Sequence, residues 1–321
     1  MCKGRVSGAF VGVCLLSSGS AFATGFDWRL DGIAALGDSY VEEYRFQPPD
    51  KSAAKNFVEI LAEYRGLNFG TYAEDLTRGE PRLAGYEFNY GRDTARSSDL
   101  LAQGQHTGVA ALANAGRVEL GVMFIGGNTF RDVFIAPDPV AALQAVVPQT
   151  LTDVGTAVQT MLAAHPDMKV VVANVPDLRH IPEVKGAVAA GLVPQQFVDA
   201  VSQTIRIYNG QLKLMADAEP RLALVDAYGL LEGIMDGSRP GASFPLDTQV
   251  PSHDPGHLWV DTIHAGTAGH ILLANEYIGA INSEFGGTIE LVVVPEPSSA
   301  GVALVSAAAL CGRRRRVRSV A

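Results

Sequence analysis

Residues 32–39 read Gly-Ile-Ala-Ala-Leu-Gly-Asp-Ser, an apolar run that ends in a glycine, an acid and a hydroxyl. The run 32–36 has the length and the unbroken apolar character of a strand that is buried on both faces. Gly, Asp and Ser favour tight turns, so we expect the strand to stop there and to present the hydroxyl of Ser39. In parallel sheets, ligands bind at this carboxyl edge of the strands.

The rest of the chain alternates between two patterns. Apolar runs that predict buried strands occur at 118–125, 169–175 and 222–225, with a weaker one at 86–90. Segments with helical spacing occur at 53–64, 97–113, 141–164, 194–218 and 267–281. This alternation predicts βαβ units, and hence an α/β fold: a three-layer α/β/α sandwich with a mainly parallel, five-stranded sheet. Neither a repeat nor a low-complexity linker divides residues 24–287, so we expect one domain there.

Charge and cysteine content limit the function of the body of the chain. Of 321 residues, 47% are hydrophobic and 18% charged, as in an ordinary folded protein. Residues 24–297 hold 18 basic and 34 acidic residues, a net charge of −16, which argues against nucleic acid or an anionic bilayer as a partner. The three cysteines, at positions 2, 14 and 311, lie outside this body and leave it no disulfide, thiolate metal site or cysteine nucleophile.

The N-terminus predicts export. Lys3 and Arg5 precede a short apolar stretch, and Ala21-Phe22-Ala23 has the small-x-small pattern that signal peptidase cleaves. Residues 1–23 are therefore predicted to be a signal peptide.

The C-terminus predicts a sorting tail. Pro295-Glu296-Pro297 precedes the apolar stretch 298–312, which would rise about 22 Å as a helix and is marginal for a membrane span. Five arginines follow it. This order resembles the PEP-CTERM sorting signal, which implies a linker at 288–297, a sorting or anchor segment at 298–321, processing by an exosortase-like enzyme and delivery to the cell surface or extracellular matrix. An ordinary C-terminal anchor is the alternative; in both cases the body is exported and only the tail meets the membrane.

Three further motifs offer chemistry that a serine nucleophile needs. Asp261-Thr262-Ile263-His264 supplies a base and, three residues earlier, an acceptor for its second nitrogen. Gly126-Gly127-Asn128 follows the strand at 118–125, where the asparagine amide can face an oxyanion. The weak strand ends at Asn89-Tyr90-Gly91-Arg92, where a free backbone N–H could point into the same site.

Together these four blocks resemble those of the SGNH or GDSL hydrolase superfamily, over residues 33–281. The resemblance implies a flavodoxin-like fold and a serine esterase or lipase that cleaves carboxylic esters through an acyl-enzyme. Ser39 would be the nucleophile, His264 the general base and then acid, and Asp261 its orienting carboxylate. The oxyanion hole would combine the N–H of Ser39, the amide of Asn128 and a second-block N–H, with Gly91 favoured and Thr94 the alternative. No cofactor or metal is implied, and the partner is an ester substrate: a lipid, a short-chain acyl ester or an acylated saccharide.

Departures from the family pattern keep a second function open. Thr129 stands where an acid usually follows the asparagine, Thr94 lies in a stretch that usually contains a further glycine, and Ala265 replaces a frequent proline. A non-catalytic surface or matrix binding protein on the same fold is therefore the alternative.

Other polar and aromatic groups carry weaker hypotheses. Six acids and histidines close in sequence leave a metal-dependent deacetylase as a third possibility: His253, Asp254, His257, Asp261, His264 and His270. We interpret Asp177 and His180 as cap and loop residues. The aromatic cluster at 86, 88 and 90 is interpreted as core packing rather than as a pocket wall.

Overall fold

The computed structural model describes residues 32–47, 51, 53–74, 84–239, 246–254 and 256–294. The predicted signal peptide at 1–23, the Pro-Glu-Pro motif and the predicted sorting segment at 298–321 lie outside these ranges. Within them, the structure contains no helix with the length and apolar character needed to cross a membrane.

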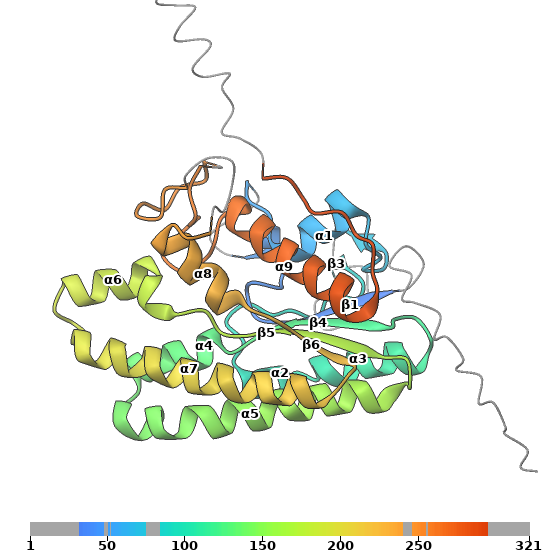
Figure 1. The fold of residues 1–321 in the computed structure, drawn as a ribbon, viewed down its shortest axis with the longest axis horizontal. Helices are drawn as coiled ribbons and strands as arrows, with labels where there is room; N and C mark the ends of the chain where they lie inside the picture. Colours follow the sequence, from blue (N-terminus) through green and yellow to red (C-terminus); the bar gives the residue numbers. More distant parts are fainter. Residues whose placement is uncertain are drawn as a thin grey trace, which may run out of the picture.

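A parallel sheet forms the centre of the molecule (Figure 1). Its strands lie in the order β1 (Ile33–Gly37), β4 (Leu120–Phe124), β5 (Lys169–Ala173) and β6 (Leu222–Val225). All three neighbouring pairs are parallel, with Ile33 opposite Leu120, Leu120 opposite Lys169 and Val170 opposite Leu222. The α/β class and the four strong strand predictions are thereby confirmed.

The prediction of a fifth strand at 86–90 was wrong in extent. Only Asn89 forms a parallel bridge with Ala35 of β1, supported by hydrogen bonds from the Ala35 N–H to Phe88 O (2.9 Å) and from the Tyr90 N–H to Ala35 O (2.7 Å). The start of the segment, β3 (Gly85–Tyr86), pairs antiparallel with β2 (Tyr72–Ala73) instead, which diverts it from the main sheet. With the bridged segment around Asn89 counted as a strand, the order across the sheet is this segment, β1, β4, β5 and β6. The chain reverses its direction of travel across the sheet between β1 and β4, which is therefore the topological switch point.

Helices cover both faces of the sheet (Figure 1). One layer holds α2 (Ser97–Ala102), α3 (Gln105–Asn114), α5 (Pro139–Ala164) and α7 (Gln195–Ala218), and the other holds α1 (Phe57–Arg65), α8 (Ala227–Asp236) and α9 (Thr267–Phe285). The helix predicted at 97–113 is divided in two, because Gly104 adopts a left-handed conformation with φ of 70°. Three short elements lie near the site described below: α4 (Gly127–Arg131) follows β4, and η3 (Leu178–His180) and α6 (Pro182–Ala189) follow β5.

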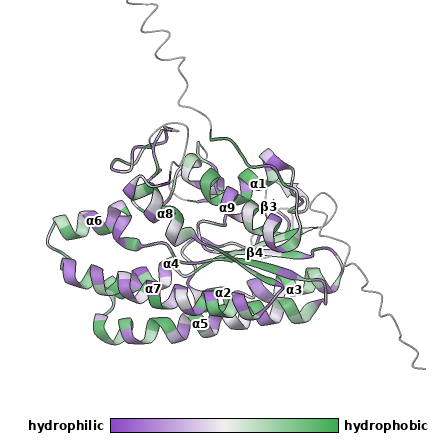
Figure 2. Cartoon of the chain, in the orientation of Figure 1, coloured by the Kyte–Doolittle hydropathy of each residue, from purple (hydrophilic) through white to green (hydrophobic). Residues whose placement is uncertain are grey.

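Two hydrophobic cores lie on the two faces of the sheet. Alternate residues of β1 point to opposite sides: Ala34 and Leu36 belong to one core, and Ile33 and Ala35 to the other. All four are completely buried, so β1 is apolar on both faces, as a central parallel strand requires. Figure 2 shows the consequence, with hydrophobic strands at the centre and helices that alternate between hydrophobic and hydrophilic bands.

The end of the described chain is packed against α9. Residues 287–294, which we call the C-terminal strap, are extended, and Ile289, Val292 and Val294 are buried in the core on the α9 face. The side chain of Asn282 exchanges two hydrogen bonds with the backbone of Ile289, and that of Asn275 does the same with Val292. The segment predicted as a linker is therefore attached to the domain at least as far as residue 294.

Candidate active site

The turn after β1 presents Ser39 at the switch point of the sheet. Gly37 has a φ of 147°, and a Cβ atom there would lie 1.9 Å from the carbonyl oxygen of Phe124 on β4, so only glycine fits. The backbone N–H of Tyr40 donates to Oδ1 of Asp38 at 3.0 Å, which closes the turn around Ser39. The serine is 5% exposed, on the wall of a pocket.

A second turn brings His264 to the serine. The backbone N–H groups of Ile263 and His264 donate to Oδ1 of Asp261 at 2.8 and 2.7 Å. Nδ1 of His264 lies 2.8 Å from Oδ2 of the same carboxylate, and Nε2 lies 2.9 Å from Oγ of Ser39. The structure thus brings together all three predicted catalytic side chains in one hydrogen-bonded chain, which can move a proton away from the serine hydroxyl.

The environment of Asp261 keeps this side chain ionised. Partial burial raises its pKa, but the hydrogen bonds and charge interaction with His264 and the two backbone N–H groups outweigh burial and hold the pKa well below its usual range. Nζ of the buried Lys51 lies 3.6 Å from Oδ2 and adds a positive charge on this side. An ionised Asp261 fixes the tautomer of His264, with the proton on Nδ1 and the lone pair of Nε2 facing Ser39.

Two tyrosines connect the serine turn to the histidine turn. The hydroxyl of Tyr40 donates to Ile263 O at 3.0 Å and accepts the N–H of Ala265 at 3.3 Å. The hydroxyl of Tyr44 donates to Ala265 O at 2.9 Å. These bonds hold both sides of His264 at a sequence separation of more than 200 residues, so reasoning from sequence missed them; the only local signal is that both tyrosines follow Ser39 closely.

His270 supports this framework in its neutral form. It is completely buried, and burial followed by the charge of His264 lowers its pKa to about 3. Its Nε2 lies 2.5 Å from the Tyr44 hydroxyl. Because that hydroxyl already donates to Ala265, we infer that its oxygen accepts a hydrogen bond from the Nε2–H of His270, which leaves Nδ1 as an acceptor with no partner in the described part of the chain.

The two second-block candidates differ in whether their N–H is already bonded. The N–H of Gly91 donates to Oδ1 of Asn89 at 2.9 Å and is therefore not available to an oxyanion. Thr94 has a φ of 62° and is the one residue other than glycine with a positive φ within the described ranges. Its N–H has no acceptor among the described residues. The alternative, Thr94, therefore fits the role of second-block donor better than Gly91.

Asn128 lies on the same pocket wall as Ser39. Its Nδ2 donates to Ala95 O at 3.1 Å, next to Thr94 in the chain, and this bond leaves the second amide hydrogen of Nδ2 for a ligand. Thr129, which stands in place of the usual acid, accepts the N–H of Ser97 on its Oγ1 at 3.0 Å and so caps the start of α2. The N–H of Ser39 also has no acceptor among the described residues. Ser39 and Asn128 therefore each hold an N–H with no acceptor among the described residues on the wall of one pocket, and Thr94 lies next to the residue that Asn128 contacts.

Asp38 is an unusual neighbour of Ser39. It is 2% exposed, and complete burial raises its pKa to about 7, with the charge of Asp93 adding to the effect and the hydrogen bond from Tyr40 opposing it. With its pKa raised into the neutral range, Asp38 makes the charge of this turn depend on pH.

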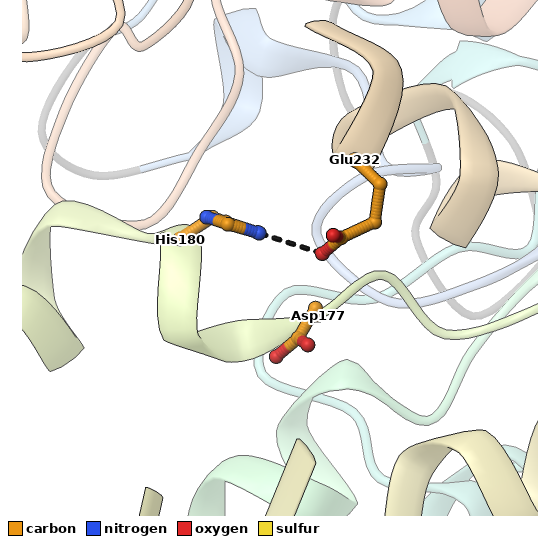
Figure 3. Close-up of side chains that lie close together, drawn as sticks. All are labelled: Asp177, His180 and Glu232. Atoms are coloured by element: carbon orange, nitrogen blue, oxygen red, sulfur yellow. Dashed lines mark hydrogen bonds and ion pairs between the residues drawn. The ribbon is translucent and has the colours of Figure 1, made fainter. Parts of the chain in front are cut away.

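The six clustered acids and histidines of the metal hypothesis do not converge. In the part of the chain that the structure describes, three ligand atoms come together only at Asp177, His180 and Glu232 (Figure 3). There Nε2 of His180 lies 2.6 Å from Oε1 of Glu232, and the guanidinium of Arg179 contacts both Glu232 (2.8 Å) and Asp177 (3.2 Å). Because Arg179 already compensates both carboxylates, this cluster is an ion-pair network that joins the loop after β5 to α8. Asp177 also caps η3, as predicted.

The fold and these contacts define an α/β protein with a Ser-His-Asp hydrogen-bonded chain at the carboxyl edge of a parallel sheet. No family model matches the sequence, and no curated protein matches it. Among solved structures, it is similar to a lipase from a goat rumen metagenome (12% identity, TM-score 0.47, covering 78% of this chain and 97% of that one). It is also similar to a mutant acetyl-xylooligosaccharide esterase from Geobacillus (14%, 0.46, 80% and 98%) and to an extracellular lipase from Streptomyces rimosus (18%, 0.45, 79% and 99%).

Proposed function

We propose that this protein is an exported serine hydrolase that cleaves carboxylic esters. The observation that carries the proposal is the position of His264, with Nε2 2.9 Å from Oγ of Ser39 and Nδ1 2.8 Å from Oδ2 of Asp261. A binding protein has no physical need for a base aligned on a hydroxyl in this way.

The chemistry follows from these contacts. Oγ of Ser39 forms a bond to the ester carbonyl carbon while its proton passes to Nε2 of His264. The N–H groups of Ser39 and Thr94 and the amide of Asn128 stabilise the oxyanion, at about 3 kcal/mol for each donor. His264 then gives its proton to the departing alcohol as the carbon–oxygen bond breaks. Water attacks the acyl-enzyme by the reverse sequence, releasing the carboxylic acid and returning the proton to Ser39.

The same proposal covers the two ends of the chain. The signal-like residues 1–23 and the Pro-Glu-Pro, apolar and arginine segments after residue 294 support export and delivery to the cell surface or matrix, with signal peptidase and an exosortase-like enzyme as processing partners. Fractionation of cells that express the full chain, with and without residues 295–321, tests this part by the location of the protein.

Labelling tests the catalytic part directly. Purified protein is incubated with a fluorophosphonate probe and with p-nitrophenyl acetate and butyrate, beside Ser39→Ala and the matched control Ser283→Ala, whose serine lies on the exposed face of α9. We expect the wild type and Ser283→Ala to be labelled and active, and Ser39→Ala to be neither. A folded wild type that is unlabelled and inactive would instead support the non-catalytic binding protein.

A further inference from the structure

A second, apolar pocket adjoins the pocket of the nucleophile. Its inner wall is formed by side chains of α8, α9 and the loop before His264: Leu230, Leu231, Ile234, Leu258, Trp259 and Leu273. We call it the apolar pocket. Figure 1 shows α8 and α9 on the same face of the sheet, and Tyr40 and Phe124, which also line the pocket, stand at the carboxyl ends of β1 and β4.

The two pockets share a wall. Tyr40, Phe124, Pro176 and Ile181 line both the apolar pocket and the pocket that contains Ser39. Tyr40 directly follows the nucleophile, and Ala265, which lines the apolar pocket, directly follows His264. The apolar pocket is therefore lined by the chain neighbours of Ser39 and of His264 and shares four residues with the pocket of Ser39.

The side chains that line the apolar pocket are almost entirely apolar and have almost no free hydrogen-bonding groups. None of its described residues is charged. The hydroxyl of Tyr40 is already bonded to Ile263 and Ala265, and Nε1 of Trp259 donates to Thr248 O at 3.2 Å. A sugar ring placed here would lose hydrogen bonds to water without replacement, whereas a hydrocarbon chain would gain from leaving water.

We propose that the apolar pocket binds a hydrocarbon chain of the ester that Ser39 attacks, so that the substrates are aliphatic esters rather than acetylated saccharides. This inference rests on the proposed serine hydrolase activity. The chain can belong to the acyl part or to the alcohol part of the ester, since the pocket borders both Ser39 and His264 through their chain neighbours. Burial of each methylene raises kcat/KM about fourfold.

Two substrate series distinguish the acyl from the alcohol part. In the first, the acyl chain of p-nitrophenyl esters grows from acetate to butyrate and hexanoate; in the second, acetate is kept and the alcohol grows from ethyl to butyl and hexyl. We expect kcat/KM to rise about 15-fold for two added methylenes in one of the series. Flat dependence on chain length in both series would overturn the inference.

A pocket-filling variant ties the effect to this surface. Ile234 is half-buried on α8, so Ile234→Trp fills the apolar pocket without removing a fully buried side chain. We expect the ratio of kcat/KM for the six-carbon chain to that for the two-carbon chain to fall about tenfold. Ile207→Trp is the matched control, because Ile207 is a half-exposed helical isoleucine on α7 that lines neither pocket, and it should keep the wild-type ratio.

A binding measurement separates this inference from the proposed function. Trp259 lies in the pocket wall, so 1-octanol should change its fluorescence saturably in Ser39→Ala and not in Ser39→Ala combined with Ile234→Phe, which narrows the pocket without adding a second indole to it. If fluorophosphonate labels Ser39 but neither chain length nor octanol has an effect, the pocket inference falls and the hydrolase stands. If octanol binds but Ser39 is never labelled, the pocket is a binding site and the hydrolase proposal falls.

Discussion

Both carboxylate oxygens of Asp261 act on His264: Oδ2 lies 2.8 Å from Nδ1, while Oδ1 accepts the backbone N–H of the same residue at 2.7 Å. One side chain therefore fixes the backbone of the histidine and the orientation of its ring. A short Asp-x-x-His turn can do this only if the aspartate is ionised, and its lowered pKa meets that condition.

Asp261→Asn should reduce kcat about 10⁴-fold, because an amide can turn its NH₂ toward Nδ1 and stabilise the wrong tautomer of His264. Rates of p-nitrophenyl butyrate hydrolysis measure this. Asp254→Asn, in the same loop but exposed, is the control and should stay close to wild type. Equal losses in both variants, together with inactivation by a chelator, would favour the metal-dependent alternative instead.

Asn128→Ala should lower kcat by about 10²- to 10³-fold with little change in KM, since the amide acts on the oxyanion of the transition state. A substitution of the next residue, Thr129, is expected to affect stability and not kcat. Thr129→Ala removes the acceptor of the Ser97 N–H and should cost about 1 kcal/mol of stability while kcat is retained. Steady-state kinetics and urea unfolding of the two variants separate these roles. A small effect of Asn128→Ala on kcat would remove the asparagine from the oxyanion hole.

Thr94→Gly should stabilise the protein by about 1 kcal/mol, because a β-branched residue at φ of 62° is strained and glycine is not. The same change at Thr107, inside α3, is the control and should destabilise by a similar amount. Thermal unfolding measures both. If Thr94→Gly lowers the melting temperature, side-chain contacts of Thr94 outweigh the strain of its backbone.

Asp38→Asn should change the dependence of stability on pH. The pKa of Asp38 is raised from 3.8 to about 7, so the folded state holds the proton more tightly than the unfolded state. The stability that this proton contributes is complete below pH 3.8 and is lost as the pH rises through 7. The variant is neutral throughout, so its free energy of unfolding relative to wild type should increase between pH 4 and 7, by at most about 4 kcal/mol.

Urea unfolding at pH 4, 5, 6, 7 and 8 measures that difference. Other buried groups, such as Glu59, with a pKa raised to about 7 by burial, titrate in both proteins and cancel in the comparison. A difference that does not vary with pH would mean that Asp38 is ionised across the whole range.

The strands and turns that depend on local sequence pattern could be predicted from the sequence alone. The strands at 118–125, 169–175 and 222–225 and the turn at Gly37-Asp38-Ser39 all belong to mostly apolar runs that end in turn-forming residues, and the structure has each of them. Because Ser39 and Asn128 each follow a strand of a parallel sheet, both were expected at the carboxyl edge of the sheet, and in the structure both line one pocket.

The second-block N–H and the extent of the fifth strand could not be predicted, because both depend on contacts between distant segments. The N–H of Gly91 donates to the side chain of Asn89, whose own Nδ2 contacts Val41 and Glu43, so packing against the serine turn decides that the Gly91 N–H is already bonded. The fifth strand at 86–90 was overestimated for a related reason, since Tyr86 pairs with Tyr72 and not with β1. Asn89 lies in the same motif as Gly91, but Val41, Glu43 and Tyr72, which hold the segment in place, are distant in sequence and not visible in its own pattern.

The last prediction concerns the attachment of the C-terminal strap. Asn275 and Asn282 lie seven residues apart, two turns along one face of α9, and their amides receive Val292 and Ile289, three residues apart in the extended strap. Asn275→Ala and Asn282→Ala each leave a backbone N–H and C=O of the strap without a partner, and each should cost about 1–2 kcal/mol. Asn114→Ala, at the exposed end of α3, is the control and should be neutral.

Amide exchange shows whether this cost falls on the strap alone. In the two variants, the N–H groups of Ile289 and Val292 should exchange faster than those of α9, because the strap has no hydrogen-bonded strand beside it in the main sheet. Uniform loss of protection across α9 would mean instead that strap and helix unfold together. In that case the strap belongs to the cooperative core of the domain, and a tail that begins after residue 294 would depart from a rigid point.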